Sequence, residues 1–190
     1  MAFMTKQDAR AATQKSRASR TDAQLQNEGQ SLAQHNWDSL LGGYRVTAYV
    51  SMKDEPNTSS LLENLANSDT AVWVPIMKKG RALAWGKFSK SLAVNSFGVA
   101  EPEVDEDFQL DSVTALIIPA QRAGLDGTRL GRGAGYYDRA LEKLPTHSDG
   151  GPKRIVVVFD DEVDESVPHD SWDQTMDVIV TPQRIIDIKK

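Results

Sequence analysis

The 190-residue sequence contains no cysteine. It can therefore form no disulfide bond, offers no thiolate nucleophile and has no cysteine ligand for zinc. The three histidines, His35, His147 and His169, also lack the spacing of metal ligands. The absence of cysteine favours a reducing compartment, and we expect the protein to be cytoplasmic.

Long apolar runs and an excess of positive charge are missing as well. No stretch approaches the roughly 20 apolar residues of a membrane span, so we expect a soluble protein with no membrane partner. Residues 1–20 have no apolar signal core, although their Lys, Arg, Ala and Ser content leaves a transit peptide as an alternative. Lys and Arg total 22 against 27 acids, a net charge of −5, which argues against a nucleic-acid partner.

Apolar and helical segments alternate along the chain. Residues 4–41 have helical spacing, interrupted at Gly29 and stopped at Gly42-Gly43, and further helices are predicted over Thr58–Asn67 and Tyr136–Leu144. Several of the predicted strands are continuous apolar runs, typical of strands buried on both faces. They are Val46–Ser51, Ala71–Pro75, Ala82–Phe88, Val113–Pro119, Ile155–Phe159 and Val178–Thr181. The pattern predicts one α/β domain over residues 1–190, a three-layer α/β/α sandwich with a mostly parallel central sheet.

Glycine is concentrated in the segment from Gly127 to Arg139, GTRLGRGAGYYDR. It follows the predicted strand Leu116–Pro119 and leads into the helix that begins at Tyr136. Glycines leave backbone N–H groups free to converge on an anion, and Arg129 and Arg132 add charge-assisted donors. The segment is neither a Walker A loop nor a dinucleotide fingerprint. By itself it predicts a phosphate-binding loop, with a structural glycine turn as the alternative.

The complete pattern Gly-x-Arg-Leu-Gly-x-Gly-x-Gly-Tyr-Tyr-Asp-Arg resembles the signature of the 5-formyltetrahydrofolate cyclo-ligase (5,10-methenyltetrahydrofolate synthetase) family. Other parts of the chain resemble the family in the same order: Lys6-x-x-x-Arg10, Tyr49–Thr58, Val74-Pro75, Ser96–Pro102 and Phe159–Pro182. The resemblance therefore extends along nearly the whole sequence.

The resemblance implies a fold similar to sugar-phosphate isomerases and CoA-transferase-like proteins. It also implies an ATP- and Mg²⁺-dependent cyclisation of 5-formyltetrahydrofolate to 5,10-methenyltetrahydrofolate, with release of ADP and phosphate. The formyl oxygen is first phosphorylated by ATP, and the 10-nitrogen of the folate then displaces the phosphate. We expect these two small molecules to be the partners of a monomeric enzyme.

The resemblance also implies roles for individual residues. The residues expected to bind ATP are Lys6, Arg10, Arg129, Leu130, Gly131, Arg132, Gly133, Ala134, Gly135, Tyr136 and Tyr137. Those expected to bind the folate are Val50, Glu55, Phe97, Arg132 and Tyr136. Arg129, Arg132 and Tyr137 are the expected catalytic residues, and Asp138 and Asp173 the expected metal ligands. Local evidence alone would leave Lys6 and Arg10 as ordinary charges on a helix and Glu55 as part of a polar turn.

The choice of Asp173 over Asp170 depends on the alignment. Asp173 lies five positions after Pro168 and eight before Thr181, as in the family, whereas Asp170 fits neither count. Asp170 remains the alternative, and both could be plain loop acids.

The sequence also departs from the family at several positions. Gly124 replaces a common aspartate, Ala134 a lysine, Glu162 a glutamine, Trp172 a histidine and Phe97 a frequent tryptophan. The departures at Gly124, Ala134 and Trp172 leave a catalytically impaired folate-binding or regulatory homologue as one alternative. A phosphosugar-isomerase-like enzyme of similar fold and a paralogue acting on another formyl compound are the others.

Overall fold

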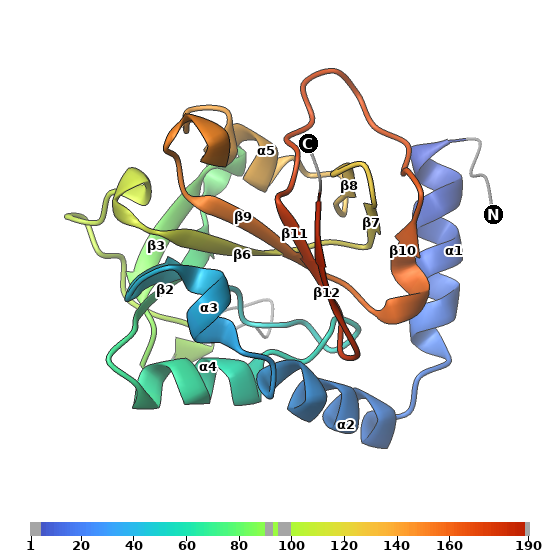
Figure 1. The fold of residues 1–190 in the computed structure, drawn as a ribbon, viewed down its shortest axis with the longest axis horizontal. Coiled ribbons are helices and arrows are strands. Elements are labelled where there is room, and N and C mark those ends of the chain that lie inside the picture. The colour runs from blue at the N-terminus through green and yellow to red at the C-terminus, as the bar shows by residue number, and fades with distance from the viewer. Residues whose placement is uncertain (1–4, 90–92, 95–99, 189–190) are drawn as a thin grey trace.

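A mixed sheet forms the centre of the protein (Figure 1). In the computed structural model, which describes residues 5–89, 93–94 and 100–188, it has seven strands in the order β12-β11-β9-β6-β1-β2-β3. Neighbours from β11 to β2 run parallel, and only the outer pairs, β11 with β12 and β2 with β3, are antiparallel. In chain order these strands are β1 (Arg45–Thr47), β2 (Ala71–Met77), β3 (Leu83–Lys87), β6 (Ala115–Pro119), β9 (Lys153–Val157), β11 (Val178–Val180) and β12 (Ile185–Asp187).

Helices lie on both faces of this sheet (Figure 1). The described part of the chain forms α1 (Lys6–Ala18), α2 (Asp22–Ala33), α3 (Trp37–Leu41), α4 (Ser59–Asn67) and α5 (Tyr136–Leu141). Short 3₁₀ turns are η1 (Lys79–Arg81), η2 (Leu110–Ser112), η3 (His147–Asp149) and η4 (Asp160–Glu162). Polar side chains cap several of the helices, as at Thr21, whose hydroxyl accepts from Gln24 N.

Alternate strand residues supply the two halves of the apolar core. Ile117 and Ile155 face α2, α3 and α4, whereas Leu116 and Val156 face the side covered by α5. Because successive side chains of a strand point to opposite faces, a strand covered on both sides must be apolar throughout. The continuous apolar runs of the sequence therefore mark the central strands.

Two smaller sheets complete the structure. One has the order β10-β7-β8, formed by Val163–Asp164, Arg122–Gly124 and Arg129–Leu130, and the other pairs β4 (Ala93–Val94) with β5 (Ala100–Glu101). Strand β7 lies between β6 and the glycine segment, and it forms a hairpin with β8 inside that segment. The predicted order of strand, glycine loop and helix is therefore confirmed, with a hairpin inserted.

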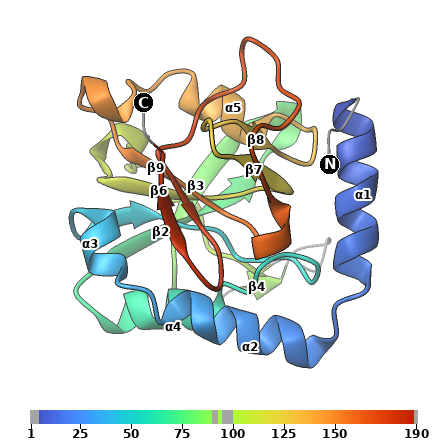
Figure 2. The ribbon, with the colours of Figure 1, turned by 45° about the vertical axis from the view of Figure 1, so that its right-hand side comes forward.

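Helix α1 stands at one side of the sheet, beside the segment that contains η4 and β10 (Figure 1, Figure 2). Its buried residues, Ala9, Thr13 and Arg17, are spaced four apart and so form a single stripe. Ala9 packs against Leu130 and Val167. This contact places the amino-terminal half of α1 next to β8 and the glycine segment.

Several sequence predictions need correction. The helix predicted over Tyr136–Leu144 ends at Leu141. Gly29 does not interrupt a helix but lies inside α2, where an added Cβ would come within 2.8 Å of Asn57 Cβ, so its role is close packing. The predicted strand Val46–Ser51 ends at Thr47, because Thr58 Oγ1 donates to Tyr49 O and accepts from Ser51 N. The predicted helix end at Gly42 is confirmed: Gly42 caps α3 and has a left-handed backbone conformation.

The expected α/β architecture is confirmed, with a large, mostly parallel sheet flanked by helices. Within the described ranges, none of the helices combines the length and apolar character required to cross a bilayer.

Candidate active site

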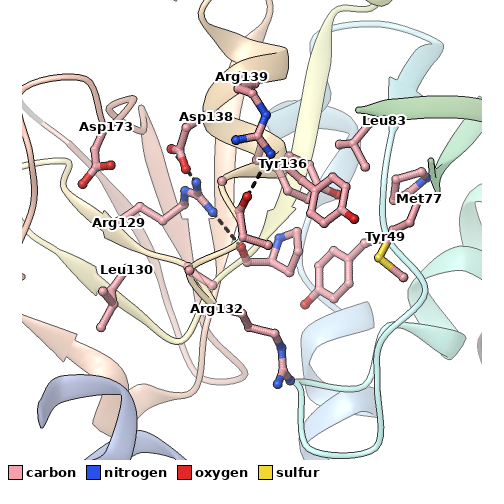
Figure 3. A pocket seen from close by; sticks show the side chains of 18 of the residues that line it. Tyr49, Met77, Leu83, Arg129, Leu130, Arg132, Tyr136, Asp138, Arg139 and Asp173 are labelled. Carbon is pink, nitrogen blue, oxygen red and sulfur yellow. Dashed lines mark hydrogen bonds and ion pairs between the residues drawn. The ribbon is translucent and has the colours of Figure 1, made fainter. Parts of the chain in front are cut away.

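A cavity of about 760 Å³ opens at the carboxyl ends of β1, β2 and β6 (Figure 3). Side chains at or just beyond the ends of these parallel strands line it: Tyr49, Val50, Pro75, Met77, Pro119 and Ala120. This edge of an open α/β sheet is where ligands bind, and the volume is that of a small-molecule site.

The glycine segment forms one wall of this cavity. Residues 131–135 connect β8 to α5, and Gly133 and Gly135 adopt φ values of 97° and 67°, which disfavour any other residue. Arg10 Nε donates to Gly131 O over 2.9 Å, and a Cβ at position 133 would lie 3.2 Å from Arg10 Cζ. The loop conformation and the approach of α1 therefore both depend on Gly133.

Arg129 lies beneath this loop, almost fully buried. Its Nη2 donates to Asp138 Oδ1 over 2.7 Å, and its Nη1 donates to Pro119 O over 3.3 Å (Figure 3). The guanidinium carbon also lies 5.9 Å from the centre of the Tyr137 ring. Arg129 is thus held in one position, with Asp138 as its counter-ion.

Arg132 contacts the segment that follows β1 rather than its own loop. Its Nε donates to Glu55 Oε1 over 3.0 Å and its Nη2 to Asp54 Oδ1 over 2.6 Å. Glu55 is buried, and its other oxygen accepts from Met52 N. Arg132 therefore links the two segments predicted to bind ATP and the folate.

Lys6, at the start of α1, joins two carboxylates of a turn near the C-terminus. Its Nζ lies 2.6 Å from Asp170 Oδ2 and 2.5 Å from Asp173 Oδ2. Burial opposes the charge of Lys6, but hydrogen bonds to Asp170 and Asp173 outweigh it and raise the pKa of the ammonium above its usual value. A lysine and two carboxylates, separated by more than 160 residues of sequence, thus meet at the cavity.

The carboxylates are too few for a cage built from protein groups alone. Within residues 5–89, 93–94 and 100–188, His, Asp and Glu form no group of three or more that could hold a metal ion. Asp138 and Asp173 nevertheless line the same cavity. A cation there would need further ligands from a bound molecule.

The buried hydroxyls of Tyr49 and Tyr137 have no hydrogen-bond partner among the described residues. Burial raises the pKa of both well above the usual value, so each keeps its proton at neutral pH. The Tyr137 ring packs edge-on against Trp85, with centroids 6.4 Å apart. Because buried polar groups are nearly always paired, these hydroxyls are available to a ligand.

The cavity has two unlike sides. In Figure 3, Asp138, Asp173 and Arg129 gather on one side, and Tyr49, Met77 and Leu83 on the other. Tyr136 and Arg132 lie between them (Figure 3). One side thus suits a charged group that binds through ions, and the other suits a flat, partly apolar one.

Every described residue predicted for the site lines this one cavity. They are Lys6, Arg10, Val50, Glu55, Arg129, Leu130, Gly131, Arg132, Gly133, Ala134, Gly135, Tyr136, Tyr137, Asp138 and Asp173, and Asp170 joins them. Phe97 lies outside the described residues. The roles assigned to these residues stay predictions.

Sequence reasoning missed several lining residues: Tyr49, Met77, Leu83, Arg139 and Trp172. Tyr49 and Met77 could have been suspected, because they lie close to the ends of predicted strands. For Leu83, which belongs to the antiparallel edge strand β3, the sequence carries no such signal.

The structure shows which groups surround Gly124 and Ala134, two of the positions at which the sequence departs from the family. A Cβ at Gly124 would lie 2.4 Å from Asp126 Oδ1 and 2.3 Å from Thr128 Oγ1, so the Asp126 carboxylate fills the space beside this position. Ala134 O accepts from Arg139 Nη2 over 2.8 Å, and Arg139 lines the cavity. A cation thus lies beside the loop although position 134 provides none.

Comparison with known proteins gives concordant matches. The model of the 5-formyltetrahydrofolate cyclo-ligase family matches residues 3–182. A 5-formyltetrahydrofolate cyclo-ligase from Mycolicibacterium smegmatis is 33% identical over 167 residues, 83% of this chain and 84% of that protein. One from Escherichia coli is 26% identical over 87% of this chain and 93% of its own length. The solved 5,10-methenyltetrahydrofolate synthetase from Aquifex aeolicus shares the fold, with a TM-score of 0.81, 24% identity and coverage of 98% of this chain and 94% of that one.

Proposed function

The chain belongs to the 5-formyltetrahydrofolate cyclo-ligase family, and from that membership we propose how its cavity performs the family's reaction. The protein is an ATP-dependent enzyme that closes 5-formyltetrahydrofolate to 5,10-methenyltetrahydrofolate and releases ADP and phosphate. We propose that residues 1–190 form a single catalytic domain. Since one chain supplies both sides of the cavity, we also propose that it acts as a monomer.

The charged side of the cavity is the proposed ATP site. Lys6 and Arg10 approach it from α1, one helical turn apart, and Arg129 approaches from below the loop. The backbone of Gly131–Gly135 lines the same cavity as these cations, so its N–H groups would add donors to their positive charge at one phosphate chain. Arg139, which lies beside Ala134 O, is the proposed substitute for the lysine that the loop lacks.

Asp138 and Asp173 fit a Mg²⁺ ion that arrives with ATP. Magnesium is commonly bound through one or two carboxylates, with phosphates and waters as its other ligands, and Asp138 and Asp173 would supply such a pair on this wall. When bound, the ion neutralises phosphate charge during transfer. Arg129 and Lys6 orient the two carboxylates, because each donates a hydrogen bond to one of them.

The aromatic and apolar side is the proposed folate site. Val50 and Tyr136 would contact the planar ring system, and Glu55 would accept from its N–H groups. The Tyr49 hydroxyl, which has no partner among residues 5–89, 93–94 and 100–188, is a further donor on this side. Phe97 stays a proposed pterin contact on the resemblance alone.

The reaction then takes place where the two sides meet. The formyl oxygen attacks the γ-phosphorus, and ADP leaves. The 10-nitrogen next attacks the formyl carbon, the phosphate departs with the former formyl oxygen, and the nitrogen gives up its proton. Arg132, which lies between Glu55 and the loop, would stabilise the transferred phosphoryl group together with Arg129. The buried hydroxyl of Tyr137 would donate a hydrogen bond to the same phosphoryl group.

The observation that carries this proposal is the ion pair between Arg132 and Glu55, which joins the ATP side to the folate side within hydrogen-bond distance. Both substrates can therefore be held side by side in one cavity, as an in-line transfer requires.

The test is an assay of the purified protein with 5-formyltetrahydrofolate, ATP and Mg²⁺, following methenyl absorbance and ADP release together. We expect the two products to appear in equal amounts and only when both substrates are present. Arg132→Lys should lower kcat/KM by about a hundredfold, because lysine cannot reproduce the forked contact. Folate binding without either product would favour an impaired binding protein instead.

A further inference from the structure

One tryptophan of the chain is exposed where the other three are buried. Trp172 is 68% exposed, whereas Trp37, Trp73 and Trp85 are 5%, 5% and 7% exposed. Trp172 also lines the cavity described above. A large aromatic side chain is thus in contact with both solvent and the site.

The backbone that carries Trp172 is anchored on both sides. Asp173 N donates to Asp170 O over 3.1 Å, and Asp170 N donates to Asp173 Oδ2 over 2.8 Å, which closes the turn. The Lys6 ammonium holds both carboxylates of this turn from α1. The backbone that carries the indole is therefore held next to the charged side of the cavity.

The position of the Asp170–Asp173 turn determines which substrate the Trp172 indole can contact. Asp173, the neighbour of Trp172 in the sequence, lies on the side opposite Tyr49, Met77 and Leu83 (Figure 3). The turn therefore lies on the other side of the cavity from Tyr49, Met77 and Leu83, while Lys6, a proposed phosphate ligand, contacts it directly. A flat group attached to phosphates on this side is the purine base of the nucleotide.

We propose that the Trp172 indole stacks on the purine base of the nucleotide and contributes to its affinity. The inference rests on the proposed function, since it presupposes that ATP occupies the charged side. Stacking of one base on an aromatic side chain corresponds to about a 5- to 150-fold change in affinity on alanine substitution. It is tolerant of base identity, because every base has a π-face.

The experiment compares the wild-type protein with Trp172→Ala and Trp172→Phe. Binding of ATP, of inorganic tripolyphosphate and of 5-formyltetrahydrofolate is measured by calorimetry at constant Mg²⁺. We expect Trp172→Ala to weaken ATP binding by about tenfold and Trp172→Phe by less than threefold. The affinities for tripolyphosphate and for the folate should not change, because neither ligand carries a purine.

Fluorescence provides an independent readout. Since the other three tryptophans are buried, iodide should quench mainly Trp172 in the free protein, and ATP should protect it. Tripolyphosphate should give no such protection. As a control for folding, the thermal unfolding midpoints of both variants should equal that of the wild-type protein.

Three results would overturn the proposal. Unchanged ATP affinity in Trp172→Ala would show that the ring makes no useful contact. Equal weakening of ATP and tripolyphosphate would show that the turn, not the ring, matters. Weakened folate binding would place the ring against the pterin. Failure of the proposed function has a different signature, namely a wild-type protein that binds no ATP and forms no methenyl product.

Discussion

Asp170 and Asp173 both contact the Lys6 ammonium, but their surroundings differ. The Asp173 side chain is 14% exposed and also accepts from Asp170 N, whereas the Asp170 side chain is 44% exposed. A carboxylate held by two donors near the wall of a cavity is better oriented for a metal than one at the solvent-exposed rim. At the scale of single residues, we therefore expect Asp173 rather than Asp170 to be the metal ligand, which stays a prediction.

This difference predicts a ranking of two matched variants. Asp173→Asn should raise the Mg²⁺ concentration for half-maximal activity by about tenfold or more, and Asp170→Asn by less than threefold. Both changes remove one charge at the same turn, so each serves as the control for the other. The measurement is a magnesium titration of the cyclisation rate at saturating ATP. A larger effect of Asp170→Asn would reverse the assignment.

At the scale of elements, helix α1 is held by a buried ion pair far from the end that lines the cavity. Arg17 donates to both carboxylate oxygens of Glu162 over 2.7 and 2.8 Å, and both side chains are at most 1% exposed. Arg17 Nη2 also donates to Ala120 O at the cavity, and Glu162 Oε2 accepts from Phe159 N. Lys6 and Arg10 project from the other half of the same helix, so the pair positions them.

Removal of Arg17 should be costly because it leaves a buried carboxylate without its partner. We expect Arg17→Met to lower the free energy of unfolding by about 3–5 kcal/mol, measured by urea denaturation. Arg184→Met is the matched control, since Arg184 is 54% exposed beside Asp160 and should contribute less than about 1 kcal/mol. A similar loss in both variants would contradict the prediction.

The same helix should also link stability to substrate affinity. If Arg17→Met remains folded, its KM for ATP should rise several-fold while the KM for the folate changes little, because α1 carries residues of the ATP side only.

At the scale of the whole molecule, acid should weaken the fold through carboxylates that the native state keeps ionised. Burial disfavours the charge of Asp126, but hydrogen bonds from Ser166 and Thr128 outweigh this and lower the pKa of its carboxyl. Asp161 behaves in the same way, with Ser16 and Arg20 as its partners. A folded-state pKa below the unfolded value stabilises the protein above the unfolded pKa, near 4, and this contribution is lost as pH falls through the folded value.

We therefore expect the thermal midpoint to fall as the pH is lowered from about 5 to 3. Asp126→Asn should have a lower midpoint at pH 7 and a flatter dependence on acid. Asp69→Asn, at an exposed position, is the control and should follow the wild type. Scanning calorimetry at a series of pH values provides the measurement. Parallel curves for wild type and Asp126→Asn would show that this carboxylate does not contribute.

Much of the element pattern was predictable because it depends on local periodicity. The continuous apolar runs marked β6, β9 and β11, and Gly42 marked the end of α3. Short edge pairs such as β7 with β8 were missed, since strands of two or three residues carry almost no periodic signal. Gly29 was misread because its reason is contact with Asn57, a residue distant in the sequence.

By itself, the sequence determined the glycine loop, its arginines and the order of strand and helix around it, because backbone preferences act over a few residues. Tertiary structure alone decided that Lys6 meets Asp173, that Arg132 turns to Glu55 and that the Tyr49 hydroxyl has no partner in the part of the chain that the structure describes. These contacts join residues far apart in the chain or depend on what surrounds a side chain in the fold. Only the packing of α1 and of the strand ends brings such groups together, and no local pattern records that packing.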